Sequence, residues 1–189
     1  MAKRSTSTTE SVYQIKITLL QCDPPIWRRI LVPGNTTLAR LHSILQAAMG
    51  WGNMHLHEFL VDGKLYGGPH SHHGADVKNE KTVTLTRVAP KVKSKILYTY
   101  NFSEGWQHEI IVEKISALEE GVRYPKCIDG DRSCPPEDCG GIRGYAELID
   151  VINDPEHPDR NEMLEWVGDD FDPDDFSPNA VNIVLKRVK

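Results

Sequence analysis

The sequence predicts an α+β domain with a mainly antiparallel sheet that opens strand–strand–helix, carries its helices on one face and ends in a helical final third. Three observations support this prediction. Apolar and polar residues alternate over Val12–Leu20, as in a strand with one buried face. Apolar residues recur at helical spacing over Thr37–Met49. The final third is acidic and contains helix-start signals.

The composition suits one ordinary globular domain over residues 11–189, because 39% of the 189 residues are hydrophobic and 26% are charged. Residues 1–10 are polar, have no apolar signal core, and are expected to be a disordered lead-in. Since no apolar run approaches the length of a membrane span, we expect a cytoplasmic protein with reduced thiols. The net charge of −5 argues against nucleic acid and leaves a protein partner or a homo-oligomer.

Turn and capping residues delimit the first elements. Asp23-Pro24-Pro25 predicts a turn between the first strand and a second one over Ile26–Val32, so the two strands form an antiparallel hairpin. Thr36 or Thr37 can cap the first amides of the helix that follows. Gly50 is placed to end that helix.

The middle of the chain predicts further strands. These cover His55–Val61, Thr82–Val88, Lys95–Phe102 and Trp106–Ile115. Asp62-Gly63 is a hairpin turn signal after the first of them. The last two are separated by a short polar turn, so we expect them to pair as a hairpin.

The final third predicts helices. Gly144–Ile152 and Asn161–Val167 each carry apolar residues on one face. Asp172-Pro173 and Ser177-Pro178 each place a capping residue before a proline, which is a helix-start signature. The apolar residues of Val181–Val188 are expected to continue the last helix.

Three of the four cysteines lie within thirteen residues, at Cys127, Cys134 and Cys139, on an expected loop. Thiolates are good zinc ligands, and one histidine would complete a tetrahedral site. The intervening six and four residues are longer than the spacing of common zinc pairs. Two alternatives stay open: a structured loop with partly buried thiols, and a disulfide between two of the cysteines.

The histidines offer a second set of candidate ligands. His55 and His57 lie two residues apart on a predicted strand, so both would project from one face. His108 lies on another predicted strand, and three imidazoles could converge on a metal or a proton-handling pocket if the strands are neighbours. The alternative is a local hydrogen bond for each ring at the sheet margin. A solvated loop is expected for His70, His72 and His73.

Two arginines and several acids are further candidate site residues. Arg28 and Arg29 could hold an anion with their forked donors, or could solvate a sheet face or stack on a tryptophan. Glu137 and Asp138 follow two prolines, where carboxylates suit the start of a helical turn. The acidic run 169–175 lacks the central glycine and terminal glutamate of a calcium loop, so we expect it to cap helices.

Short motifs occur in a fixed order along the chain, among them Pro25-Ile26-Trp27-Arg28-Arg29, Leu41-His42, Ala48-Met49-Gly50-Trp51, His55-Leu56-His57-Glu58-Phe59, Trp106-Gln107-His108 and Cys134-Pro-Pro-Glu-Asp-Cys139-Gly-Gly. With these motifs the chain resembles the plasmid pRiA4b open-reading-frame-3-like family from Val12 to Val188. The resemblance implies a protein of plasmids and mobile elements, without an established biochemical activity. The family's usual Asp-Phe-Gly-Asp-x-Trp reads here Asn101-Phe102-Ser103-Glu104-Gly105-Trp106, so a chemical role of the first acid would be lost or altered.

We therefore expect a binding or structural module with a polar cluster of cysteine and histidine, and zinc is the cofactor that the cluster implies. The enzyme alternative is a metal-assisted hydrolase in which Glu58 or Glu137 takes a proton from bound water. A closed four-ligand site would favour the structural role, and an open coordination position the hydrolase. A third alternative is an accessory DNA-associated protein of a mobile element, which the acidic charge counts against.

Overall fold

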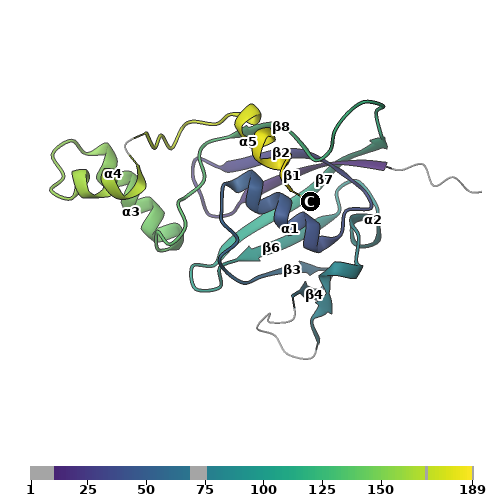
Figure 1. Ribbon diagram of the computed structural model, residues 1–189. Helices are drawn as coiled ribbons and strands as arrows, with labels where there is room; N and C mark the ends of the chain where they lie inside the picture. The colour runs from purple at the N-terminus through teal and green to yellow at the C-terminus, as the bar shows by residue number, and fades with distance from the viewer. Residues whose placement is uncertain (1–10, 69–75, 169, 189) are drawn as a thin grey trace, which may run out of the picture.

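The computed structural model describes residues 11–68, 76–168 and 170–188, which form one eight-stranded sheet with helices (Figure 1). The strand order is β5-β4-β3-β6-β7-β1-β2-β8. The strands are β1 (Ser11–Leu19), β2 (Ile26–Pro33), β3 (His57–Val61), β4 (Lys64–Gly67), β5 (Lys78–Asn79), β6 (Lys95–Tyr100), β7 (Trp106–Ala117) and β8 (Lys126–Asp131). The helices are α1 (Leu38–Met49), the 3-10 turn η2 (Glu80–Thr82), α2 (Leu85–Val88), α3 (Gly141–Asn153), α4 (Arg160–Val167) and α5 (Pro178–Leu185).

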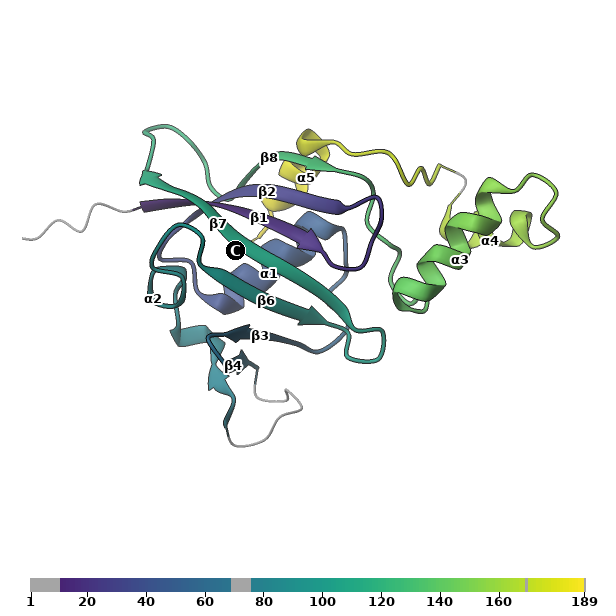
Figure 2. The ribbon, with the colours of Figure 1, turned by 180° about the vertical axis from the view of Figure 1, so that it is seen from behind.

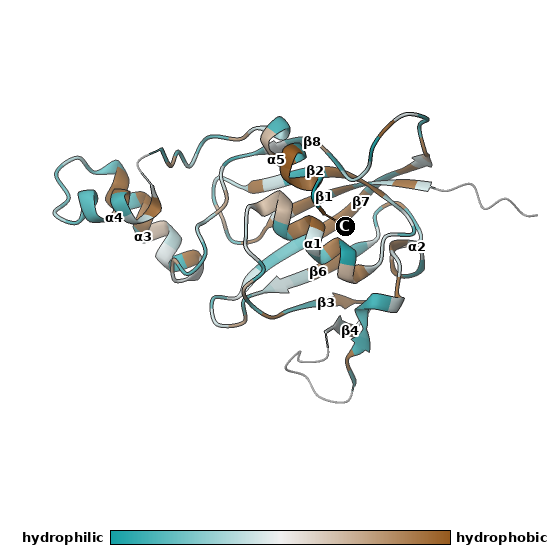
Figure 3. Cartoon of the chain, in the orientation of Figure 1, coloured by the Kyte–Doolittle hydropathy of each residue, from teal (hydrophilic) through white to brown (hydrophobic). Residues whose placement is uncertain are grey.

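Helix α1 packs lengthwise on one face of the sheet, and Figure 2 shows it behind the strands when the molecule is turned. The Thr37 hydroxyl accepts a hydrogen bond from the Arg40 amide, and Gly50 ends the helix in the left-handed region at φ 85°. Leu38, Leu41 and Leu45 are fully buried in the core. Burying one such side chain contributes about 1.5–3 kcal/mol to folding. Hydrophobic residues accordingly concentrate where α1 meets the strands (Figure 3).

Asn182 of α5 covers the outer edge of β8, the last strand of the sheet. Its side-chain amide donates to the carbonyl of Cys127 at 2.8 Å and accepts from the amide of the same residue at 2.8 Å. The side chain therefore makes the two bonds that a neighbouring strand would make. This arrangement protects an edge that could otherwise pair with another chain.

Helices α3 and α4 form an arm that lies beyond the sheet in both ribbon views (Figures 1 and 2). The two ends of this α3–α4 arm are tied together at its base. The Ser133 amide donates to the Pro173 carbonyl at 3.0 Å, and its hydroxyl donates to the Asp172 carbonyl at 2.7 Å. Arg132 pairs with Asp174. The acidic segment after α4 thus closes the base of the arm; Asp169 lies outside the described residues.

Most predicted elements are confirmed. The strands expected within residues 12–20, 26–32, 55–61, 95–102 and 106–115, and the helices within 37–49, 144–152 and 161–167, are present, as is the helix that begins after Ser177. Thr82–Val88 is wrong as a strand, because it forms the end of η2 and α2. Asp172-Pro173 begins a turn and no helix. The predicted lead-in over residues 1–10 lies outside the described residues.

The fold class as predicted was wrong. The sheet is mixed, because β4 and β5 run parallel. Helices make up 29% and strands 32% of the structure. The final third also contains most of β8 and long irregular connections, and α3 and α4 leave the sheet instead of joining α1 on its face. Among the described residues, no helix combines the length and apolar character needed to cross a membrane.

Candidate functional site

The cysteines of the predicted loop occupy different surroundings. Cys127 lies on β8, is buried, and directs its thiol to the Asp129 carbonyl at 3.4 Å. Cys134 contacts the Met49 sulfur at 3.6 Å. Cys139 precedes α3. All four cysteines of the chain, which lie within the described residues, are free thiols.

Burial keeps these thiols protonated. It raises the pKa of Cys134 to about 11 and that of Cys139 to about 12. Cys22 lies close enough to Cys134 for its charge to raise that pKa further, although it is far away in the sequence. A cysteine binds a metal ion as the deprotonated thiolate, so a thiol that stays protonated is a poor metal ligand. Within the ranges that the structure describes, no three His, Cys, Asp or Glu side chains are arranged to hold a metal, and the zinc site stays a prediction.

The three predicted histidines do not share one site. His55 precedes β3, and its Nε2 lies 3.1 Å from Oδ1 of Asp138. His57 lies on β3, and its Nε2 is 2.8 Å from Oε2 of the buried Glu80. His108 is fully buried, and burial lowers its pKa to about 4. Neither of its ring nitrogens has a hydrogen-bond partner among the described residues.

His42 of α1, which was missed as a candidate, belongs to an interior polar network. Its ring stacks on His57 with centroids 3.4 Å apart. Its Nδ1 lies 2.7 Å from the Tyr98 hydroxyl, which accepts from Gln46 at 3.0 Å, and its Nε2 lies 2.5 Å from Oδ1 of Asn53. Burial, followed by the charge of His57, lowers the pKa of His42 to about 4. The network therefore fixes α1 against the sheet with a neutral imidazole.

Arg28 is a buried cross-brace between elements. Its guanidinium donates to the carbonyls of Ala48 at 3.1 Å and Asp131 at 2.8 Å. It also contacts the Cys134 sulfur at 3.0 Å and stacks on the Phe176 ring at 4.2 Å. These contacts join α1, β2, the cysteine loop and the segment before α5. An anion at Arg28 would have to displace them.

Arg29 points to the other face of the sheet and is also occupied. Its Nε and Nη2 reach the two carboxylate oxygens of Glu113 at 2.7 and 3.1 Å, and its Nη1 lies 2.6 Å from Asp129. Such forked pairing is the geometry in which arginine binds carboxylates. The anion site stays a prediction, because the arginine's partners here come from the protein itself.

Glu137 clamps the cysteine loop onto the body. Its carboxylate accepts hydrogen bonds from the Gly52 amide at 2.6 Å and from the Tyr100 hydroxyl at 2.5 Å. The Trp51 indole donates to the Pro135 carbonyl at 2.9 Å beside it. Glu137, one of the two residues expected to take a proton from bound water in the hydrolase alternative, therefore already accepts two hydrogen bonds from the protein.

The altered family motif docks the start of α3. Asn101, at φ 53°, donates from its amide group to Glu104 at 3.0 Å and accepts from the Ser103 amide at 3.2 Å. The second carboxylate oxygen of Glu104 accepts from the amides of Gly140 at 2.6 Å and Gly141 at 3.2 Å. An asparagine serves this turn without an acid at the first position.

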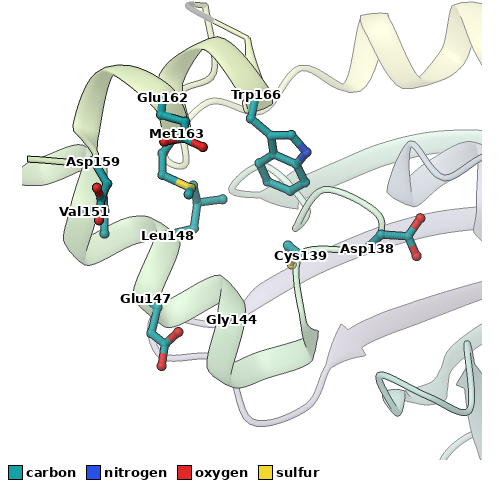
Figure 4. A pocket seen from close by; sticks show the side chains of 10 residues that line it. All are labelled: Asp138, Cys139, Gly144, Glu147, Leu148, Val151, Asp159, Glu162, Met163 and Trp166. Atoms are coloured by element: carbon teal, nitrogen blue, oxygen red, sulfur yellow. The ribbon is translucent and has the colours of Figure 1, made fainter.

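A groove of about 460 Å³ lies between α3, α4 and the end of the cysteine loop (Figure 4). Its apolar surface comes from Leu148, Val151, Met163 and Trp166. Trp166 is 51% exposed, which is unusual for so large a ring. In Figure 4 its indole hangs from α4 towards Cys139. The groove thus offers an accessible aromatic face above an aliphatic floor.

Four carboxylates surround this apolar surface: Asp138, Glu147, Asp159 and Glu162. The described residues that line the groove include no lysine or arginine. The Glu147 carboxylate accepts a hydrogen bond from the exposed Arg143 at 3.2 Å, and the Asp138 carboxylate contacts His55. Asp159 and Glu162 stand at the start of α4, where the helix dipole favours a negative charge. The groove is therefore an acidic site on the arm.

Gly144 sets how closely the cysteine loop approaches α3. A Cβ atom at this position would overlap the carbonyl group of Cys139. Glycine therefore lets the loop rest directly on the helix, and this contact brings Asp138 and Cys139 to the groove wall.

A family model described as plasmid pRiA4b ORF-3-like protein matches residues 11–180. The chain belongs to this family. The uncharacterized protein y4hQ of Sinorhizobium fredii (strain NBRC 101917 / NGR234) is 38% identical over 164 residues, covering 86% of this chain and 84% of that protein. The crystal structure of the protein of unknown function MM3350 from Methanosarcina mazei Go1 superposes with a TM-score of 0.82 at 40% identity, covering 91% of this chain and 98% of the other. The pRiA4b ORF-3-like family thus accounts for the fold, and function must come from the site.

Proposed function

We propose that this protein is a binding module whose α3–α4 groove holds a cationic group. The observation that carries the proposal is the half-exposed Trp166 above an aliphatic floor, ringed by carboxylates with no basic residue in the lining. Indole faces attract cations through their ring quadrupole. Ligand sites are commonly concave and largely apolar, with a few polar groups that orient the ligand.

A lysine or arginine side chain matches this surface in two ways. Its alkyl stem can lie along the apolar wall while its charged head reaches the carboxylates. A cation–π contact contributes about 0.5–1 kcal/mol at an exposed site, and one exposed ion pair about 0.2–1 kcal/mol. With about 0.8 kcal/mol for each buried methylene, these terms support dissociation constants of the order of millimolar.

The same residues disfavour the other functions at this position. A phosphate backbone would meet four carboxylates, which repel it. The hydrolase alternative assigns a proton-accepting role to Glu58 or Glu137; neither residue lines the groove, and the oxygens of Glu137 already accept two hydrogen bonds. Cation binding needs no metal, and a cation at Glu147 or Asp138 would compete with Arg143 or His55.

The test is a titration of ¹⁵N-labelled protein with acetyl-lysine amide and acetyl-arginine amide, read from the backbone amide resonances of the groove residues on α3 and α4. Citrulline amide, which keeps the shape of arginine without its charge, is the ligand control. We expect the two cations to bind and citrulline to bind at least about tenfold more weakly. Glu162→Gln and Trp166→Ala should each weaken binding. Glu165→Gln, at an exposed position of the same helix outside the groove, should not. No response to either cation at about 10 mM would refute the proposal.

A further inference from the structure

Two exposed apolar side chains lie on the loop between α1 and β3, which touches the groove wall through His55. Met54 is 78% exposed and Leu56 is 42% exposed. His55 stands between them and contacts Asp138, which lines the groove. In Figure 4 Asp138 lies on the cysteine loop, at the right-hand end of the groove, and its carboxylate points away from α4. Met54 and Leu56, here called the apolar shelf, therefore flank the residue that meets the groove wall.

The shelf is held in place by hydrogen bonds from its own backbone and that of its neighbours. The Gly52 amide donates to Glu137 at 2.6 Å, and the Asn53 amide donates to Gln46 at 3.0 Å. The Met54 amide donates to a tyrosine hydroxyl at 3.0 Å. Its exposed side chain thus sits on an anchored backbone, so a partner would not have to order this loop on binding. Methionine also adapts readily to different apolar surfaces.

We infer that the partner is a basic, amphipathic segment of another protein. One lysine or arginine enters the groove while an apolar side chain of the same segment packs on the apolar shelf. This inference rests on the proposed function, because it takes the groove as the cation site. It adds a second contact, which a free amino acid or a small amine would not make.

Charge complementarity favours a protein segment over other partners. The groove presents four carboxylates and the chain carries a net charge of −5, so a nucleic acid or an anionic lipid surface would be repelled. A basic peptide is attracted to the same field, and its apolar residue accounts for the exposed methionine and leucine. Contiguous apolar surface rimmed by polar residues often marks a site of protein interaction.

A set of acetylated nine-residue peptides tests the inference. Each has one arginine in a serine and glycine background, with one leucine at a different distance from the arginine, and a leucine-free peptide is the reference. Burying a leucine side chain on the apolar shelf strengthens binding, so at least one spacing should bind roughly tenfold or more tightly than the reference. Isothermal titration calorimetry measures the affinities.

Three protein variants make the result specific. Met54→Ser with Leu56→Ser should abolish the gain from leucine and leave the affinity for the leucine-free peptide unchanged. Val92→Ser, which changes an exposed apolar residue away from the groove, should leave both affinities unchanged. Trp166→Ala should weaken both peptides.

Each outcome decides between the two proposals. If no spacing gains affinity, or if the gain survives in the Met54/Leu56 variant, the inference about the partner is wrong while the cation site stands. If neither peptide binds, the cation site itself is wrong. Displacement of the bound peptide by a mixed-sequence oligonucleotide would identify a nucleic acid as the preferred ligand and overturn the inference.

Discussion

The body of the molecule and its α3–α4 arm use polar residues in opposite ways. In the body, polar side chains such as Arg28, His42 and Glu137 are buried or hold protein partners at 2.5–3.1 Å. On the arm, Asp159 and Glu162 face a groove that also exposes Trp166. A polar group whose hydrogen bonds are made within the protein stabilises the fold, whereas an accessible polar group is free to bind a ligand. Burial and partners therefore separate the residues that hold the fold together from those of the proposed cation site.

The family motifs fall mostly on the structural side of this comparison. Arg28, Glu104 and Glu137 all belong to these motifs, and each fastens the cysteine loop or the start of α3 to the body. The groove residues of α4 lie between the motifs. The family motifs thus describe mainly the structural frame, and the α4 residues of the proposed cation site lie outside them.

The largest expected effect comes from breaking the cross-brace of the body. Arg28→Ala leaves several buried carbonyl groups without a donor and opens a void at the Phe176 ring. We expect a loss of about 3–5 kcal/mol in the free energy of unfolding, measured by urea denaturation. Arg40→Ala, on the exposed side of α1, should change it by less than about 0.5 kcal/mol. Equal effects would contradict the role of Arg28.

Acid should weaken the body through its neutral histidines. The pKa of His42 and that of His108 are both about 4 in the folded protein, against an ordinary value of 6.5. The unfolded chain therefore binds more protons between these values, and stability is full above pH 6.5 and falls as the pH drops towards 4. Each histidine accounts for about 3 kcal/mol over this window. His108→Leu should flatten the dependence of the unfolding free energy on pH; an unchanged slope would show that His108 does not titrate this way.

The contact between arm and body can be tested at Gly144. Gly144→Ala places a methyl group against the Cys139 carbonyl, so the cysteine loop must shift. Overpacking of this kind costs about 1–3 kcal/mol. Thermal unfolding measures the loss, and the cation affinity should fall with it because Asp138 and Cys139 move. Wild-type stability and affinity in the variant would mean that the loop does not depend on this contact.

Substitutions in the groove should hardly change the free energy of unfolding. Trp166→Ala and Glu162→Gln alter exposed side chains, so we expect changes within about 1 kcal/mol in urea denaturation. Together with a loss of cation binding, this result would sharpen the contrast between arm and body. A large destabilisation would instead place these residues with the structural set.

The prediction with the least bearing on the stability of the fold concerns the thiols, whose burial bears on the zinc prediction. With a pKa of about 11, the Cys134 thiol should react with iodoacetamide at pH 8 about a hundredfold more slowly than a free cysteine. Elemental analysis of untagged protein and of Cys134→Ser completes the test. About one zinc per chain, lost in the variant, would support the metal cluster and reverse the interpretation of protonated thiols.

Local sequence patterns predicted most of the helices and strands but few of the contacts between them. Alternation and capping located β1, β2 and α1, because these patterns report burial and backbone geometry over a few neighbouring residues. They missed β8, where Cys127 pairs with Ile30 of β2 among turn-forming residues. They also missed η2 and α2, since a short apolar alternation fits either kind of element.

Most of the strands and helices with their caps, and the acidic final third, follow from the sequence, whereas β8, η2 and α2 do not. The contact of Cys22 with Cys134, the stacking of His42 on His57 and the groove shared by acids of α3 and α4 emerge from the tertiary structure. These contacts join residues that are not neighbours in the chain. Their meeting depends on strand order and helix packing, which no local pattern encodes.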